Sequence, residues 1–320
     1  MLMTSYPYEP LYVNNLVKSY DGKKNAVDGI SFSVSDKEIY GLLGKNGAGK
    51  STTIKVLTTL IAPTSGDVRV LGIDPVKAPL QIKKRIGVVQ QAESFDFTTV
   101  ETNMRVYATL WEVSREEAKA RTEELLELFE LEDVRKTRAF ELSGGQKKKL
   151  QVARELIHDM DILFLDEPTV GMDPIMRRRI LDNIKKRAAN GMTVLFTTHF
   201  LEEADYICDR IAIMASGKIK VEGTSSELKQ KYGGLRTLEI TSTQVLPMEE
   251  IDILKNDLIE AGLAQEAYAE GKTVKILGKD ITKVLEDILK TVRTRITSID
   301  SINLRDATLD DVFIEVVSNH

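Results

Sequence analysis

The segment from Gly44 to Thr52 combines glycines, a lysine and hydroxyl side chains at a spacing that suits phosphate binding. An apolar run, Ile39–Leu43, precedes it and predicts a buried strand, and a helix-like pattern follows it. In that setting the glycines let backbone amides approach an anion at the helix N-terminus. Lys50 is expected to reach the β- and γ-phosphates of a nucleotide, and the Ser51 hydroxyl to hold Mg²⁺. The predicted nucleotide-binding residues of this segment are Gly44, Lys45, Asn46, Gly47, Ala48, Gly49, Lys50, Ser51 and Thr52.

Two acidic residues follow another apolar run. Residues 162–165 predict a parallel strand buried on both faces, and Asp166 and Glu167 come directly after it. Open α/β sheets place their ligands at the carboxyl ends of strands, so both carboxylates are expected near the phosphates. Asp166 is expected to act on Mg²⁺, directly or from behind its ligands, and Glu167 to orient and deprotonate an attacking water. The alternative is an Asp-Glu pair that only caps the strand.

A third candidate site is Leu142-Ser143-Gly144-Gly145-Gln146, which precedes a helix-like run over residues 147–158. Small residues with free N–H groups at a helix start form a second anion site. With this segment the chain resembles the ATP-binding subunit of an ABC transporter. The five residues match that family's signature, and the strand with the Asp-Glu pair follows in the family's order. The resemblance covers about residues 11–230.

This resemblance implies a dimer that holds two ATP molecules between its subunits. In the family, the signature of one subunit caps the γ-phosphate bound by the phosphate loop of the other. The residues that would act across the dimer in this way are Ser143, Gly144, Gly145 and Gln146. Asp173 matches the residue that signals between the subunits. Both half-sites look complete, which favours a homodimer, although pairing with a different ATP-binding chain stays open.

The resemblance also assigns roles around one nucleotide. Tyr20 matches the aromatic residue that stacks on adenine, and His199 matches the histidine that contacts the γ-phosphate. Gln91 matches the glutamine that contacts Mg²⁺ and the attacking water, but its neighbour Gln90 leaves that assignment open by one residue. The predicted catalytic residues are Glu167, His199 and Gln91. The predicted metal ligands are Ser51, Gln91 and Asp166, and the predicted cofactors are ATP and Mg²⁺.

The sequence is expected to form an α/β fold in two domains. The resemblance implies that residues 1–230 form a P-loop NTPase of ABC type, with a β-rich subdomain, a RecA-like core and a helical signature subdomain over about residues 92–158. Residues 231–236 read as a linker. Residues 237–320 show the order β-α-β-β-α-β, which predicts a small α+β accessory domain of ferredoxin-like type. The closing segment 309–315 resembles the tail of daunorubicin-resistance-type drug exporters.

Charge and composition limit the partners. The net charge of −5 argues against nucleic acid as a partner, and the basic clusters 147–149 and 177–179 are interpreted as solvated helix faces. Cys208 is the only cysteine, which excludes an intrachain disulfide and fits a reducing cytoplasm. No apolar run approaches the ~20 residues that cross a bilayer, so a membrane role requires a separate permease. The protein is therefore expected to be cytoplasmic and peripheral to the membrane.

The function predicted from the sequence is an ATPase subunit that powers an ABC exporter through that permease. Phe95, Phe97, Tyr107 and Trp111 lie in the region that docks the permease in the family; most are expected in the core, and an exposed one would contact the permease. The alternative is a soluble ABC ATPase without a permease, active in translation or chromosome maintenance. The transported cargo and the role of residues 237–320 stay open.

Overall fold

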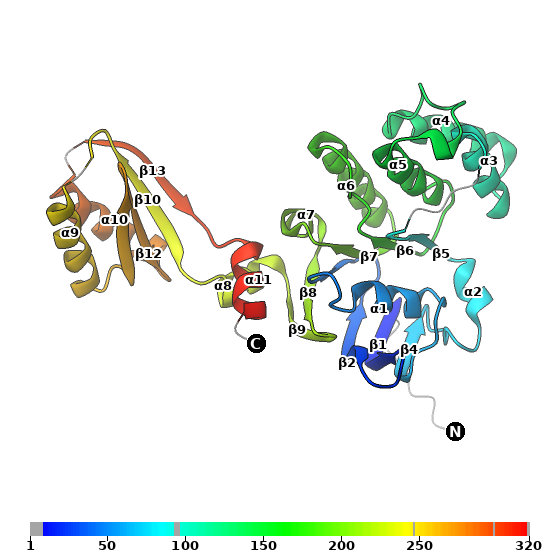
Figure 1. The fold of residues 1–320 in the computed structure, drawn as a ribbon, viewed down its shortest axis with the longest axis horizontal. Helices are drawn as coiled ribbons and strands as arrows, with labels where there is room; N and C mark the ends of the chain where they lie inside the picture. Colours follow the sequence, from blue (N-terminus) through cyan, green and yellow to red (C-terminus); the bar gives the residue numbers. More distant parts are fainter. Residues whose placement is uncertain (1–8, 93–96, 246, 297, 319–320) are drawn as a thin grey trace. The chain divides into compact units, whose positions relative to one another are not determined.

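The computed structural model describes residues 9–92, 97–245, 247–296 and 298–318 (Figure 1). Two units divide the chain, Met1–Ser225 and Ser226–His320. Six strands form the central sheet of the first unit, in the order β5 (Ile86–Val89), β6 (Ile162–Asp166), β7 (Thr193–Thr198), β3 (Ile39–Leu43), β8 (Arg210–Ala215) and β9 (Lys218–Gly223). All are parallel to their neighbours except β9, which is antiparallel to β8. Parallel strands share one carboxyl edge, so the segments after β3, β6 and β7 emerge together.

Strand β6 shows why this sheet is buried on both faces. Leu163 and Leu165 enter a core built with the helices of the signature region and with α6 (Pro174–Ala189). Ile162 and Phe164 point the other way, into a core shared with α1 (Lys50–Leu57). Successive strand residues face opposite sides, so a continuous apolar run can be buried only between two layers.

A smaller antiparallel sheet covers the second of these faces. Its strands are β2 (Asn25–Val34), β1 (Leu11–Ser19) and β4 (Ser65–Val70), in that order. The short helix α2 (Pro79–Lys83) precedes β5. The side chains of Leu11, Leu16 and Val70 are fully buried against α1 and the central sheet. This sheet is the predicted β-rich subdomain, and α1 lies beside it in Figure 1.

The helical part of the first unit contains α3 (Val100–Leu110), α4 (Arg115–Leu128) and α5 (Gly144–Glu155), with a 3-10 turn at Ala139–Glu141. Helix α4 starts at Ser114, whose side chain accepts a hydrogen bond from the amide of Glu117. Helix α7 (Leu201–Ile207) follows β7. No helix among the described ranges has both the length and the apolar composition needed to span a membrane.

The second unit is a four-stranded antiparallel sheet with helices packed on one face. The strand order is β11 (Glu266–Glu270), β12 (Thr273–Gly278), β10 (Arg236–Ser242) and β13 (Ile299–Arg305). The packed helices are α9 (Met248–Glu260) and α10 (Ile281–Arg293), whose Leu254 and Ile288 meet Leu238 of β10 in one core. Along the chain the elements follow the order β-α-β-β-α-β, and α11 (Leu309–Ser318) comes last.

The segment predicted as a linker is shorter than residues 231–236. Helix α8 (Ser225–Tyr232) occupies its first two residues, and β10 already begins at Arg236. The helix persists because Leu228 is buried, and it ends where the Gly233 amide bonds to the carbonyl of Lys229. Only residues 233–235 connect the helix to the strand.

Candidate nucleotide-binding site

The phosphate loop joins β3 to α1 and requires glycine at two positions. Gly49, which precedes α1, has φ of 111°, and a Cβ there would lie 2.6 Å from the carbonyl oxygen of Ala26. A Cβ on Gly44 would lie 2.5 Å from the carbonyl oxygen of Met214. Larger residues therefore cannot follow this path. The loop leads from β3 directly into the N-terminus of α1, the strand-loop-helix order that we predicted around Gly44 to Ser51.

Lys50 is buried inside this loop. Its ammonium donates hydrogen bonds to the carbonyl oxygens of Gly44 (2.7 Å) and Lys45 (3.3 Å). Burial lowers the pKa of Lys50, while the nearby carboxylates of Glu167 and Asp166 act in the opposite direction. The loop therefore carries a positive charge at the start of α1, where backbone amides and the helix dipole also favour an anion.

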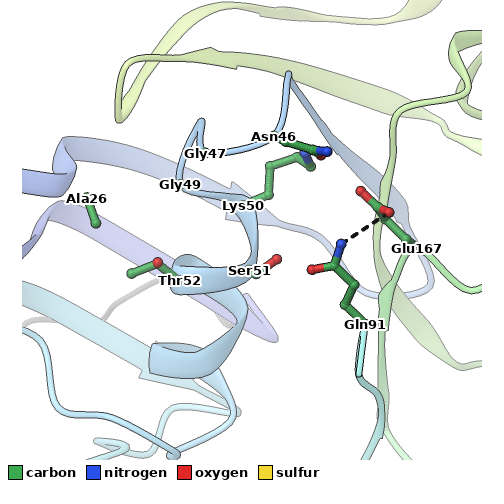
Figure 2. A pocket seen from close by; sticks show the side chains of 9 residues that line it. All are labelled: Ala26, Asn46, Gly47, Gly49, Lys50, Ser51, Thr52, Gln91 and Glu167. Carbon is green, nitrogen blue, oxygen red and sulfur yellow. Dashed lines mark hydrogen bonds between the residues drawn. The ribbon is translucent and has the colours of Figure 1, made fainter. Parts of the chain in front are cut away.

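A cavity of about 400 Å³ opens in front of the loop (Figure 2). Lys50 and Ser51 approach it from one side, and Gln91 and Glu167 face them from the other. Its lining residues are Ala26, Asn46, Gly47, Gly49, Lys50, Ser51, Thr52, Gln91 and Glu167. Ala26, at the start of β2, is the lining residue that we did not predict from the sequence. An alanine side chain has no polar group, so nothing in the sequence marked Ala26 as part of a binding site.

One hydroxyl group, that of Thr197, bonds to the carboxylate of Asp166 at the end of β6 and to the backbone amide of Glu167. Oγ1 of Thr197, on β7, donates to Oδ1 of Asp166 over 2.6 Å. The Thr197 hydroxyl oxygen also accepts a hydrogen bond from the amide of Glu167 over 3.3 Å. Asp166 and Thr197 are buried, and Asp166 does not line the cavity. Glu167 adopts φ of 52°, an uncommon conformation for a residue with a side chain. Thr197 is a site residue that the sequence analysis missed.

Two predicted residues converge on one oxygen of Glu167. Nε2 of Gln91 donates to Oε2 of Glu167 over 3.4 Å, the contact drawn in Figure 2. Nδ1 of His199 lies 3.4 Å from the same oxygen. Glu167 is mostly buried, whereas His199 is more than two-fifths exposed. The three side chains come from the ends of β5, β6 and β7, three adjacent strands of one sheet.

Helix α5 holds the backbone on either side of Gln91. Lys148 donates from Nζ to the carbonyl oxygen of Gln90 over 2.8 Å, and Gln151 donates from Nε2 to the carbonyls of Gln90 (3.1 Å) and Ala92 (2.9 Å). Gln91 is thus the glutamine that reaches Glu167. The interpretation of residues 147–149 as a solvated face is wrong for Lys148, which is buried against this backbone.

The predicted signature residues start helix α5 and lie apart from this cavity. Ser143 Oγ accepts from the amide of Gln146 (3.3 Å), and Gln146 Oε1 accepts from the amide of Ser143 (3.0 Å). This capping box leaves the amides of Gly144 and Gly145 at the helix start. None of these four described residues lines the cavity in Figure 2. A Cβ on Gly145 would lie 2.8 Å from the carbonyl oxygen of Gly171, so the signature touches the loop that leads to α6.

Tyr20 and Asp173 occupy exposed positions. Tyr20 is 62% exposed, and its hydroxyl lies 3.4 Å from Oγ1 of Thr52 at the edge of the phosphate loop. Asp173 caps α6, because its carboxylate accepts from the amide of Met176 over 3.0 Å. That hydrogen bond lowers the pKa of Asp173. Both side chains are accessible from outside the chain.

The residues around the cavity fit a magnesium-bound nucleoside triphosphate. The glycine positions leave room for backbone amides to approach phosphates, and Lys50 adds a positive charge. Ser51 and Gln91 present oxygen atoms, the ligand type that Mg²⁺ prefers. Among the described residues no group of three or more His, Cys, Asp or Glu side chains gathers into a metal cage.

Comparisons with known proteins define the class. The ABC transporter family model matches residues 27–170, and a second model, described as the C-terminal domain of DrrA1-3-like ATP-binding proteins, matches residues 223–317. A solved ATP-binding subunit of an ABC transporter aligns with a TM-score of 0.65 at 28% identity, covering 70% of this chain and 93% of the other. The chain therefore belongs to the ATP-binding proteins of ABC transporters, and it is an ATPase with the P-loop NTPase fold of that family.

Within this class the chain is similar to named export and resistance proteins. The daunorubicin resistance ATP-binding protein DrrA3 of Streptomyces coeruleorubidus is 34% identical over 319 residues, 96% of this chain and 95% of the relative. The linearmycin resistance ATP-binding protein LnrL of Bacillus subtilis is 38% identical over 72% of this chain and 74% of its own. The Nod factor export ATP-binding protein I of Paraburkholderia xenovorans is 39% identical over 73% and 77%. The predicted resemblance to the daunorubicin-resistance branch is confirmed.

Proposed function

We propose that this protein is the ATP-binding and ATP-hydrolysing subunit of an ABC exporter, and that it drives a separate membrane permease by closing as an ATP-sandwich dimer. The observation that carries this proposal is the convergence of Gln91 and His199 on one oxygen of Glu167 beside the phosphate loop. Gln91 and Glu167 line the cavity in front of that loop, and His199, which does not line it, contacts Glu167. Such an arrangement suits hydrolysis of the bound nucleotide.

Each residue then has a role in that reaction. Backbone amides of the loop and Lys50 bind the phosphates of ATP and neutralise their charge. Glu167 orients a water molecule and accepts its proton, while Gln91 and His199 position the water and the γ-phosphate. Ser51 and Gln91 would hold Mg²⁺ directly and Asp166, which does not line the cavity, would act from behind them; the ion would neutralise charge on the β- and γ-phosphate oxygens. Tyr20 stacks on the adenine ring.

The positions of the signature residues support dimerisation. Ser143 to Gln146 begin α5 and do not line the cavity of their own chain, which supports a role in capping the ATP of a partner. The contact between Gly145 and Gly171 places the loop carrying Asp173 beside the signature. That contact supports the signalling role of Asp173 between subunits. Because the chain contains a phosphate loop and a signature, two identical copies complete two sites.

Exposed apolar side chains support a membrane partner. Leu80 on α2 is 72% exposed, Phe97 before α3 is 81% exposed, and Leu110 at the end of α3 is 67% exposed. Single exposed apolar residues are ordinary, but Phe97 lies in the segment expected to dock the permease. Tyr107 and Trp111 are partly buried, as expected for core residues, and Phe95 lies outside the described residues. We place the protein at the cytoplasmic face of the membrane, bound to that permease.

The names of the relatives suggest the type of transport. Daunorubicin and linearmycin resistance and Nod factor export all appear among them, at similar identity. We therefore propose export, with the drug-resistance branch favoured because residues 223–317 match the model of the C-terminal domain of DrrA1-3-like ATP-binding proteins. ATP-driven dimer closure would be the power stroke, and hydrolysis would reset the transporter.

The test uses the Glu167→Gln variant with Glu202→Gln as its matched control, since Glu202 is exposed and lies outside the cavity. Loss of a general base slows turnover by about 10²–10⁴-fold. We expect that loss together with an ATP-dependent dimer, measured by phosphate release and by light scattering on a sizing column. The control should behave as wild type. Normal turnover in Glu167→Gln would contradict the role of this residue.

The permease is tested with the same variant. It is incubated with ATP and gently solubilised membranes of the native cell, and its bound partners are identified after affinity capture. We expect a protein with several membrane spans that is absent when ATP is omitted. Recovery of ribosomal or DNA-bound proteins without such a partner would favour the soluble type of ABC ATPase instead.

A further inference from the structure

Glu203 connects the segment after β6 to the end of β7 without lining the cavity. It lies on α7, and its Oε2 accepts one hydrogen bond from Oγ1 of Thr169 (2.9 Å) and another from Oγ1 of Thr198 (3.0 Å). The carboxylate and both threonines are buried, and Oε1 of Glu203 has no hydrogen-bond partner among the described residues. Burial raises the pKa of Glu203, and the two threonine hydrogen bonds oppose that rise. A buried acid group with this geometry requires an explanation.

The two threonines belong to the segments that carry Glu167 and His199. Thr169 follows Glu167 by two residues, and Thr198 immediately precedes His199. The Thr198 hydroxyl also accepts from the amide of Phe200 over 3.0 Å, so the backbone on both sides of His199 is held. Glu203 itself does not line the cavity and does not contact Glu167 or His199 through any hydrogen bond of the described residues.

Glu167 needs such an anchor because of its backbone. Its φ of 52° is left-handed, and residues with a side chain keep this conformation only where the surrounding structure determines it strongly. On the upstream side, Asp166 and the Glu167 amide are held by Thr197. On the downstream side, the buried Thr169 is held by Glu203. The strained residue therefore lies between two fixed points.

We propose that Glu203 is a positioning residue for ATP hydrolysis, which sets the separation of Glu167 and His199 by bridging Thr169 and Thr198. This inference rests on the proposed function, in which these two residues act on the water and the γ-phosphate. Glu203 does not touch ATP. Its carboxylate is the bridge because one oxygen accepts both hydroxyl groups, as a charged acceptor does more strongly than a neutral one.

A role in positioning differs from a role in folding in what it changes. A group that only stabilises α7 would lower the amount of folded protein without changing turnover per folded molecule. A group that sets the Glu167–His199 geometry should lower kcat while ATP still binds, because the phosphate loop lies on another element. The loss of kcat on removing this group should also depend on whether His199 is present, because the effects of residues that act together are not additive.

The experiment compares Glu203→Ala with the control Glu202→Gln on the adjacent exposed residue. We expect kcat of the folded enzyme to fall by about 10- to 100-fold, with the KM for ATP within about twofold of wild type. In a His199→Ala background the same change should lower kcat by less than about threefold. Equal losses in both backgrounds, or an unchanged kcat, would overturn the proposal.

A second pair of variants covers the case in which Glu203→Ala does not fold. Thr169→Val removes one hydroxyl at constant shape, and Thr169→Ser keeps it. We expect the valine variant to lose at least about fivefold in kcat and the serine variant to retain most of it; equal activities would refute the bridge. The proposed function fails separately: if Glu167→Gln and His199→Ala both turn over normally, the site assignment is wrong, whatever Glu203 does.

Discussion

The hydroxyl group of Thr197 is the feature whose removal tests the geometry of the site most directly. It donates to the buried carboxylate of Asp166 over 2.6 Å and accepts from the amide of Glu167. Thr197→Val keeps the branched shape and removes only the hydroxyl. Thr197→Ser keeps the hydroxyl and removes only a methyl group, so the two variants separate hydrogen bonding from packing.

The magnitudes follow from the two contacts. A hydrogen bond to a charged group contributes about 1.5–3 kcal/mol, and its loss leaves the Asp166 carboxylate buried with one donor fewer. We therefore expect Thr197→Val to lower the free energy of unfolding by about 2 kcal/mol. The serine variant loses one buried methyl group and leaves a small cavity, which costs about 1 kcal/mol. The valine variant should thus be the less stable of the two, although it keeps more apolar surface.

Urea unfolding measures this difference, followed by the fluorescence of Trp111. This is the only tryptophan of the chain and it lies in the first unit, so its signal reports the unit that contains Thr197. We also expect kcat for ATP hydrolysis to fall further in the valine variant than in the serine variant, because Asp166 and Glu167 both depend on the hydroxyl. A valine variant as stable as wild type, or a serine variant less stable than the valine one, would refute the reasoning.

Two further predictions concern helix α5 and the residues that follow it. The ring of His158 stacks on Trp111, and burial lowers the pKa of His158 to about 4. The neutral imidazole therefore contributes fully to the stability of the fold above pH 6.5, and this contribution is lost as the pH falls toward 4. Between pH 7.5 and 5, wild type should therefore lose about 2 kcal/mol more unfolding free energy than His158→Phe in denaturant titrations; equal losses would contradict the shift. Gln151→Leu removes two hydrogen bonds to the backbone around Gln91 and should cost about 1–2 kcal/mol, with a lower kcat, whereas the exposed control Gln81→Leu should change neither.

The local elements of the site could be predicted because their signals are contiguous in the chain. A glycine-rich loop between an apolar strand and a helix has few alternatives, since only glycine tolerates the backbone of Gly49 and the approach at Gly44. Apolar runs such as residues 162–165 predict strands buried on both faces, because strands of a parallel sheet are covered by helices or further layers on each side. The comparisons confirmed the family that these motifs indicated.

The contacts that hold these motifs in place could not be predicted in the same way. Lys148 stands in a run of three lysines that looks solvated, yet it bonds to a carbonyl 58 residues away. Thr197 and Glu203 carry no motif of their own, and their partners Asp166 and Thr169 lie 31 and 34 residues away in sequence. The fold sets such pairs when strands become neighbours in the sheet.

The sequence by itself determined which chemistry this protein contains: a phosphate loop, two carboxylates after a strand, and a signature at a helix start. Only the tertiary structure decided that Gln91 and His199 meet at one oxygen of Glu167, that Thr197 bonds to the amide of Glu167, and that Glu203 bonds to Thr169 two residues downstream. The physical reason is that backbone conformation and local motifs depend on neighbouring residues, whereas hydrogen bonds between buried polar groups depend on which strand ends the sheet brings together.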